Sequence, residues 1–162
     1  MRRPEINAAV EANLPALSAA DLTIGSAYET GEATLEPEDI TAFARSFDPQ
    51  PMHLDETAAA KTLFGRMVAS GWHVLALTMR LVVDARPFGA TPIIGIELDR
   101  IRFRKPILPG TTLRVRARID DLEPGSRPER AIALLTVETL DTAAEDVLVE
   151  QRWKVLLPAS RN

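Results

Sequence analysis

An aspartate and a histidine, Asp48 and His53, stand five positions apart on a stretch that also contains Pro49 and Pro51. Proline fixes its own backbone φ angle and restricts the preceding residue, so little conformational freedom is lost in holding both side chains toward one point. A carboxyl group and an imidazole so held can position a water molecule, take its proton and return a proton to a carbon. Hydration of a conjugated double bond, and the reverse dehydration, need those steps. The alternative is structural: the aspartate closes a turn and the histidine is an ordinary core or surface residue.

A second group with chemical potential is Ser70-Gly71, at the start of a long apolar stretch. Serine is a typical helix N-cap, and the first turn of a helix has unpaired N–H groups at the positive end of the helix dipole. Because Gly71 has no side chain, a ligand can approach its amide closely. Such a donor would stabilise the negative oxygen that forms on a thioester when water adds to the neighbouring carbon. The alternative is an ordinary cap without a chemical role.

A helix is expected to lead into the Asp48–His53 stretch. Pro37 suits its first position, acidic residues suit its first turn, and apolar residues recur at helical spacing as far as Phe47. The two prolines that follow cannot continue this helix. The stretch from Asp48 to His53 is therefore expected to be a stiff, irregular link between two helices.

Two further helices are expected after this link. Asp55 is a suitable N-cap for a short helix that runs toward Leu63. Ser70 is the expected N-cap of a longer helix that stops before Pro87. Apolar residues lie nearly all the way round the longer helix, which is typical of a helix surrounded by protein.

After Pro87 the apolar period changes from that of a helix to the alternation of β-strands. Strands are expected at 93–103, 113–120, 131–140 and 147–155, with an earlier strand, interrupted by glycines, within 23–35. Short turns between strands make the sheet antiparallel, and a long apolar helix needs burial, so the sheet should wrap around that helix. This is the α+β hot-dog fold. Residues 1–22 are expected to be a loosely packed N-terminal extension, followed by a single domain at 23–158.

Composition narrows the possible functions. The 162 residues include 23 acidic and 19 basic ones, giving a formal charge of -4, so no nucleic-acid partner is expected. The absence of cysteine removes thiolate metal sites and cysteine nucleophiles, and two histidines make a histidine-rich metal site unexpected. No apolar stretch is long enough to span a bilayer, and no secretory signal follows Met1. A cytoplasmic protein without membrane partners is the expectation.

Three stretches together resemble one family. They are Phe43 to Asp55, then Phe64-Gly65 with Val68 to Gly71, and Arg102 to Gly110. They resemble the MaoC-like hydratases, also called (R)-specific enoyl-CoA hydratases or acyl dehydratases, and the similarity runs from about residue 23 to residue 157. The resemblance implies reversible hydration of trans-2-enoyl thioesters to 3-hydroxyacyl thioesters, carried on CoA or an acyl carrier, with no metal and no cofactor.

The resemblance also implies roles for particular residues. Asp48 and His53 would form the catalytic dyad that holds the water, and the Gly71 N–H would polarise the thioester carbonyl. Ser70 and Gln50 would belong to the substrate-binding site, although the family usually has His and Asn at those positions. These two departures predict an altered substrate or site geometry. Family members generally act as dimers, which implies a homodimer or a dimer-based oligomer, with the pantetheine leaving between subunits.

Two other functions remain open for the same fold. One is an acyl-CoA thioesterase, which could also use an acidic residue and a helix N-terminus. The other is a non-catalytic subunit that binds acyl thioesters, which the departures at Gln50 and Ser70 make conceivable. The proline-stiffened pair favours hydration over both.

A few other residues have weaker functional signals. Arg100, Arg102 and Arg104 line one strand face, which is either simply solvated or, through Arg104 and the adjacent Lys105, in contact with CoA phosphates. His73 is expected to be a packing or capping residue in the first turn of the long helix. Trp72 and Trp153 are expected to be core or interface aromatics.

Overall fold

The computed structural model describes residues 14–160. The helical segments are η1 (Ala19–Asp21), α2 (Pro37–Phe47), α3 (Pro51–Leu54), α4 (Glu56–Ala59) and α5 (Gly71–Ala85). The strands are β1 (Ala27–Glu29), β2 (Ala33–Thr34), β3 (Ile94–Phe103), β4 (Thr112–Pro124), β5 (Arg130–Asp141) and β6 (Val147–Pro158). The four strands expected after Pro87 are confirmed, and the interrupted early strand is the pair β1 and β2.

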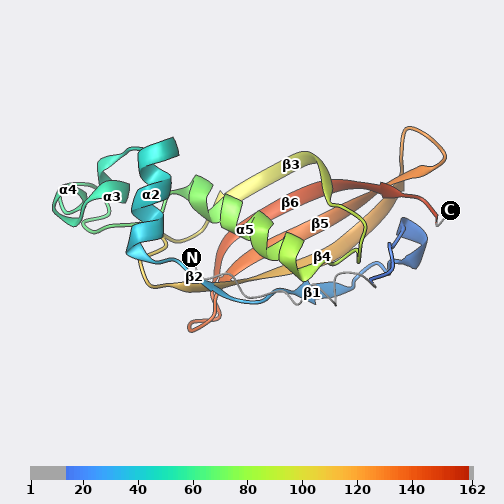
Figure 1. Cartoon of the computed structure of the whole chain (residues 1–162), viewed down its shortest axis with the longest axis horizontal. Coiled ribbons are helices and arrows are strands. Elements are labelled where there is room, and N and C mark those ends of the chain that lie inside the picture. Colours follow the sequence, from blue (N-terminus) through green and yellow to red (C-terminus); the bar gives the residue numbers. More distant parts are fainter. Residues whose placement is uncertain (1–13, 161–162) are drawn as a thin grey trace.

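All strands form one antiparallel sheet in the order β1-β4-β5-β6-β3, with β2 also paired to β4. Helix α5 runs along one face of this curved sheet, and α2, α3 and α4 gather at one end, beside the start of α5 (Figure 1). The hot-dog fold predicted from the sequence is confirmed. Within residues 14–160, no helix has the length and hydropathy needed to cross a bilayer.

The core lies between α5 and the inner face of β4, β5 and β6. The side chains of this layer alternate along each strand, so every second residue is buried. A polar contact joins the helix to the sheet inside this apolar layer: Thr78 of α5 and Thr139 of β5, both 0% exposed, have their hydroxyl oxygens 2.7 Å apart. The same Thr78 hydroxyl donates a hydrogen bond to the Val74 carbonyl. This hydroxyl pair fixes where α5 lies along the sheet.

The prediction that the long helix is surrounded by protein is wrong for the single chain. The sheet covers only the face that carries Val74, Leu77 and Leu81. On other faces of α5, Trp72 is 66% and Val83 46% exposed. The edge strand β3 is also uncovered, and its apolar side chains at 94, 96 and 98 are about half exposed.

The link between α2 and α4 is more regular than the sequence predicted. Residues 48–50 are irregular, with the Gln50 N–H donating to the Asp48 carbonyl, but Pro51–Leu54 forms the single helical turn α3. Pro51 occupies the first position of this turn, where a backbone N–H donor is not needed. The expected cap of the next helix is confirmed, because the Asp55 side chain accepts a hydrogen bond from the Ala58 N–H.

The described part of the N-terminal extension is docked, so the prediction of loose packing is wrong there. Leu17 donates a backbone hydrogen bond to Phe88, and Ala20 donates one to Ala159. Ser18 and Ala19 are buried. Residues 1–13 lie outside the described part of the chain, and the division into an extension at 1–22 and a domain at 23–158 stays a prediction.

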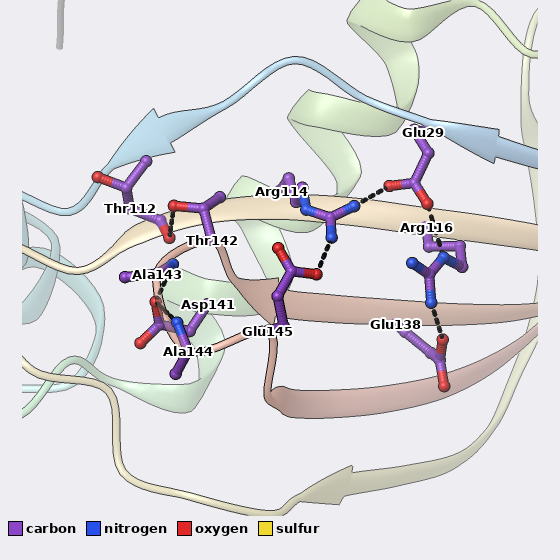
Figure 2. A network of polar contacts seen from close by, with 10 residues as sticks. All are labelled: Glu29, Thr112, Arg114, Arg116, Glu138, Asp141, Thr142, Ala143, Ala144 and Glu145. Atoms are coloured by element: carbon purple, nitrogen blue, oxygen red, sulfur yellow. Dashed lines mark hydrogen bonds and ion pairs between the residues drawn. The ribbon is translucent and has the colours of Figure 1, made fainter.

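An ionic network covers part of the outer face of the sheet. Arg114 binds Glu29 and Glu145, while Arg116 binds Glu29 and Glu138 (Figure 2). The network ties β1 to β4, to β5 and to the turn that follows β5. Isolated surface ion pairs contribute little to stability, whereas a shared network fixes several side chains together. These arginines therefore have a structural role, which is to hold neighbouring parts of the sheet together.

Candidate active site

The stretch between α2 and α3 places Asp48 and His53 side by side. Asp48 directly follows the last residue of α2, and His53 lies in the turn of α3. His53 Nε2 is 3.4 Å from Asp48 Oδ2, and the histidine is 5% exposed. The expected proximity of the two side chains is confirmed.

A hydrogen bond fixes the orientation of the His53 ring. Its Nδ1 lies 2.8 Å from the Val68 carbonyl oxygen. Because a carbonyl only accepts hydrogen bonds, Nδ1 carries the proton and donates it. In the neutral ring, Nε2 then presents its lone pair toward Asp48. The pair therefore contains a base, Nε2, that is free to take a proton.

Two donors hold the Asp48 carboxylate. Ser70 Oγ donates to Oδ2 over 2.6 Å, and Gln50 Nε2 donates to Oδ1 over 2.7 Å. The Ser70 hydrogen bond, then the Gln50 hydrogen bond, lower the pKa of Asp48 below its usual value, with a smaller contribution from nearby His53. Asp48 therefore stays ionised at neutral pH.

Ser70 also caps the long helix, as the sequence predicted. Its Oγ accepts a hydrogen bond from the Trp72 N–H over 3.3 Å while it donates to Asp48. This serine is 1% exposed. One buried hydroxyl thus connects the beginning of α5 to the carboxylate, and fixes the distance between Asp48 and the first turn of the helix.

A cavity of about 480 Å³ brings the predicted site residues together. The cavity is lined by Asp48, Gln50, His53 and Gly71. Ser70 is not a lining residue, but its hydroxyl donates a hydrogen bond to Asp48. Most of the remaining wall is apolar, and the size suits a small organic ligand. Among residues 14–160, no group of three or more His, Asp or Glu side chains is placed to hold a metal ion.

Sequence reasoning missed several residues of the apolar wall. Met52 and Ile107 line the cavity, as does Phe103 at the end of β3. Trp72 lines it too, although this tryptophan was expected in the core or an interface. Their apolar character was visible in the sequence, but only the fold brings β3 and the loop after it to the start of α5.

Arg104 and Lys105 line the same cavity and already have carboxylate partners. Arg104 Nη2 is 2.6 Å from Glu150 Oε2, and Lys105 Nζ is 2.5 Å from Asp146 Oδ2. Both cations are largely exposed. Contact of these two residues with CoA phosphates stays a prediction.

His73 packs between α5 and α2, which confirms the packing role predicted for it. Its ring stacks on Phe43, with 4.7 Å between centroids and 6° between planes. Burial lowers the pKa of His73, and the charge of Asp39 opposes this shift. Trp153, in contrast to Trp72, is 3% exposed and belongs to the core.

Known proteins are similar to this chain in sequence and fold. The family model described as MaoC like domain matches residues 19–139. The chain is 34% identical over 119 residues to the uncharacterized protein YdeM of Bacillus subtilis, covering 74% of this chain and 84% of that protein. It is 29% identical over 139 residues to the 3-hydroxyacyl-thioester dehydratase Z of Mycobacterium tuberculosis, covering 82% of this chain and 92% of that protein.

A solved structure agrees with both findings. The MaoC-like dehydratase from Rhodospirillum rubrum superimposes with a TM-score of 0.82 and 37% sequence identity, over 90% of this chain and 99% of that one. The family model covers most of the chain, and the fold matches throughout the covered part. The resemblance read from the sequence is therefore confirmed, and the chain belongs to the MaoC-like dehydratase family.

Proposed function

We propose that this protein adds water reversibly to trans-2-enoyl thioesters and so forms 3-hydroxyacyl thioesters. The observation that carries the proposal is the placement of Asp48, His53 and the Gly71 amide around one cavity. Membership of a family of hydratases and dehydratases supports it, as does similarity to a protein named 3-hydroxyacyl-thioester dehydratase Z. No redox or metal cofactor is needed for this reaction.

The proton steps follow from the states of the two side chains. A water molecule between them donates one hydrogen bond to His53 Nε2 and the other to ionised Asp48. As the water oxygen bonds to C3, Nε2 takes its proton, the C2=C3 electron pair forms a C1=C2 bond, and the carbonyl pair moves onto the thioester oxygen, where the Gly71 N–H stabilises the charge. The carbonyl re-forms when C2 takes a proton. The imidazolium then returns the proton to C2. One water is consumed and no proton is gained or lost.

Absorbance of the conjugated enoyl thioester tests this reaction. Wild-type protein mixed with crotonyl-CoA and longer trans-2-enoyl-CoAs should bleach the band without releasing thiol. Asp48→Asn and His53→Ala should each bleach it at least about 100-fold more slowly, because removal of a general acid or base costs that much. Release of free thiol would show that the protein is a thioesterase and not a hydratase. Binding without bleaching by the wild type would favour a non-catalytic binding subunit.

We further infer that the protein acts as a homodimer on CoA or acyl-carrier thioesters. The half-exposed apolar side chains of β3 and the exposed Trp72 and Val83 of α5 support self-association, since exposed large apolar side chains are common at contact sites. A cytoplasmic location stays a prediction from the sequence.

A further inference from the structure

The ring of Phe103 lies directly against the start of α5. A methyl group built on Gly71 would stand 2.7 Å from Cε1 and 2.8 Å from Cζ of that ring, and its three nearest heavy atoms all belong to Phe103. Real Cβ atoms essentially never come so close to other atoms. Phe103 also lines the cavity that contains Asp48 and His53. The phenyl ring therefore forms the part of the cavity wall beside Gly71.

A β-bulge turns Phe103 toward this cavity. Leu98 pairs with Trp153 and Phe103 pairs with Val149, and both of these β6 residues are buried on the inner face. Residues five positions apart on a regular strand point to opposite faces, so the two β3 residues can share the inner face only because the register shifts between them.

The backbone at this bulge is strained. Arg100 lies within the shifted register and has a φ of 51°. Residues other than glycine rarely adopt this left-handed backbone conformation. Bulges often occur next to active sites, where they redirect a side chain. Phe103 follows this strained and shifted segment, and its ring faces Gly71.

We propose that Phe103 determines substrate specificity by excluding acyl thioesters with a substituent on C2. The proposal rests on the proposed function, in which the thioester oxygen binds the Gly71 N–H. With the oxygen there, C2 is one bond from the carbonyl carbon and lies against the ring that already contacts Gly71. A hydrogen on C2 fits this space, whereas a methyl group meets the phenyl edge. Straight-chain enoyl thioesters are the preferred class.

The kinetic test compares crotonyl-CoA with its 2-methyl homologue, tiglyl-CoA. The ratio of their kcat/KM values should fall at least about 10-fold in Phe103→Ala, because one methyl group in an apolar pocket changes discrimination about 10- to 200-fold. The intrinsic reactivity of the two compounds cancels when this ratio is compared between variants. Phe103→Leu should give an intermediate ratio. Phe64→Ala, which removes another aromatic residue of the cavity wall, should leave the ratio unchanged. Equal ratios in wild type and Phe103→Ala would overturn the proposal.

Binding of saturated thioesters separates this proposal from the reaction itself. Calorimetry with butyryl-CoA and the isomeric isobutyryl-CoA, which carries its branch at C2, needs no turnover. Wild type should prefer the straight chain at least about 10-fold, and Phe103→Ala should lose the preference. If wild type shows this preference but hydrates no enoyl-CoA, the proposed function fails and the role of Phe103 stands. Failure of both thioesters to bind, or a preference that survives in Phe103→Ala, would overturn the proposed role of Phe103.

Discussion

The charge on Asp48 depends on two neighbouring side chains. The Ser70 hydroxyl and the Gln50 amide each donate to it and keep its pKa low. The sequence identified Asp48 and His53 through their spacing, since only five positions and two prolines separate them. It placed Ser70 and Gln50 in the substrate site, but a contact across 22 positions, such as Ser70 with Asp48, follows only from the fold.

Ser70→Ala should have an effect on stability that depends on pH. An aspartate with a lowered folded-state pKa stabilises the fold above its unfolded pKa, and this contribution is lost as pH falls through the folded-state pKa. Removing the largest cause of the shift raises the pKa of Asp48, so the variant loses more stability at pH 7 than at an acidic pH below the folded-state pKa of Asp48. Loss of the helix cap, about 1 kcal/mol, remains at both pH values.

Thermal unfolding of wild type and variants at the two pH values measures this effect. Gln50→Ala is the matched control, because it removes a donor to Asp48 but leaves the α5 cap intact. Its destabilisation should disappear at the acidic pH. The same destabilisation at both pH values in both variants would mean that the hydrogen bonds do not act through the charge of Asp48.

At the level of elements, α5 is held on the sheet by apolar packing and by the Thr78–Thr139 contact. Thr78 has a single hydroxyl proton, and it donates that proton to the Val74 carbonyl. Thr139 must then be the donor between the two threonines. The two hydroxyls are therefore not equivalent, and their removal should not cost the same.

Thr78→Val should be the more destabilising of the two single variants. It leaves the Thr139 hydroxyl buried without a partner, which costs about 1–3 kcal/mol. Thr139→Val costs less, because Thr78 keeps its bond to the Val74 carbonyl. The double variant should be more stable than Thr78→Val, since both polar groups are then gone. Urea denaturation of the three variants checks this order, and a double variant less stable than Thr78→Val would contradict the assigned hydrogen-bond direction.

Elements with a long apolar period were predictable, whereas the short turn α3 was not. The strands β3 to β6 and the helices α2 and α5 each repeat their pattern over ten or more residues. The turn α3 has four residues, too few to display a period, and Pro49 and Pro51 together argued against any helix there. Here the position of Pro51, at the start of the turn, decided the outcome.

On the scale of the whole molecule, the sequence could not distinguish two ways of covering an apolar helix. A pattern that is apolar on all sides predicts burial, but it does not say whether the covering protein is the same chain or another copy. In this chain the sheet covers one face of α5, and exposed apolar groups remain on α5 and on the unpaired edge of β3. A second copy that adds its own β3 would cover this edge.

Leu98→Glu tests this assembly. Leu98 is 52% exposed on β3, so the single chain tolerates a charge there, whereas a dimer that pairs through β3 would have to bury it. We expect sedimentation of the wild type as a dimer and at least about 10-fold weaker association of the variant, equal to about 1.4 kcal/mol. Ile24→Glu is the matched control, because Ile24 is 54% exposed and precedes β1, at the opposite edge of the sheet. A monomeric wild type, or equal association of both variants, would contradict a dimer that pairs through β3. The apolar edge of β3 would then bind a partner other than this chain.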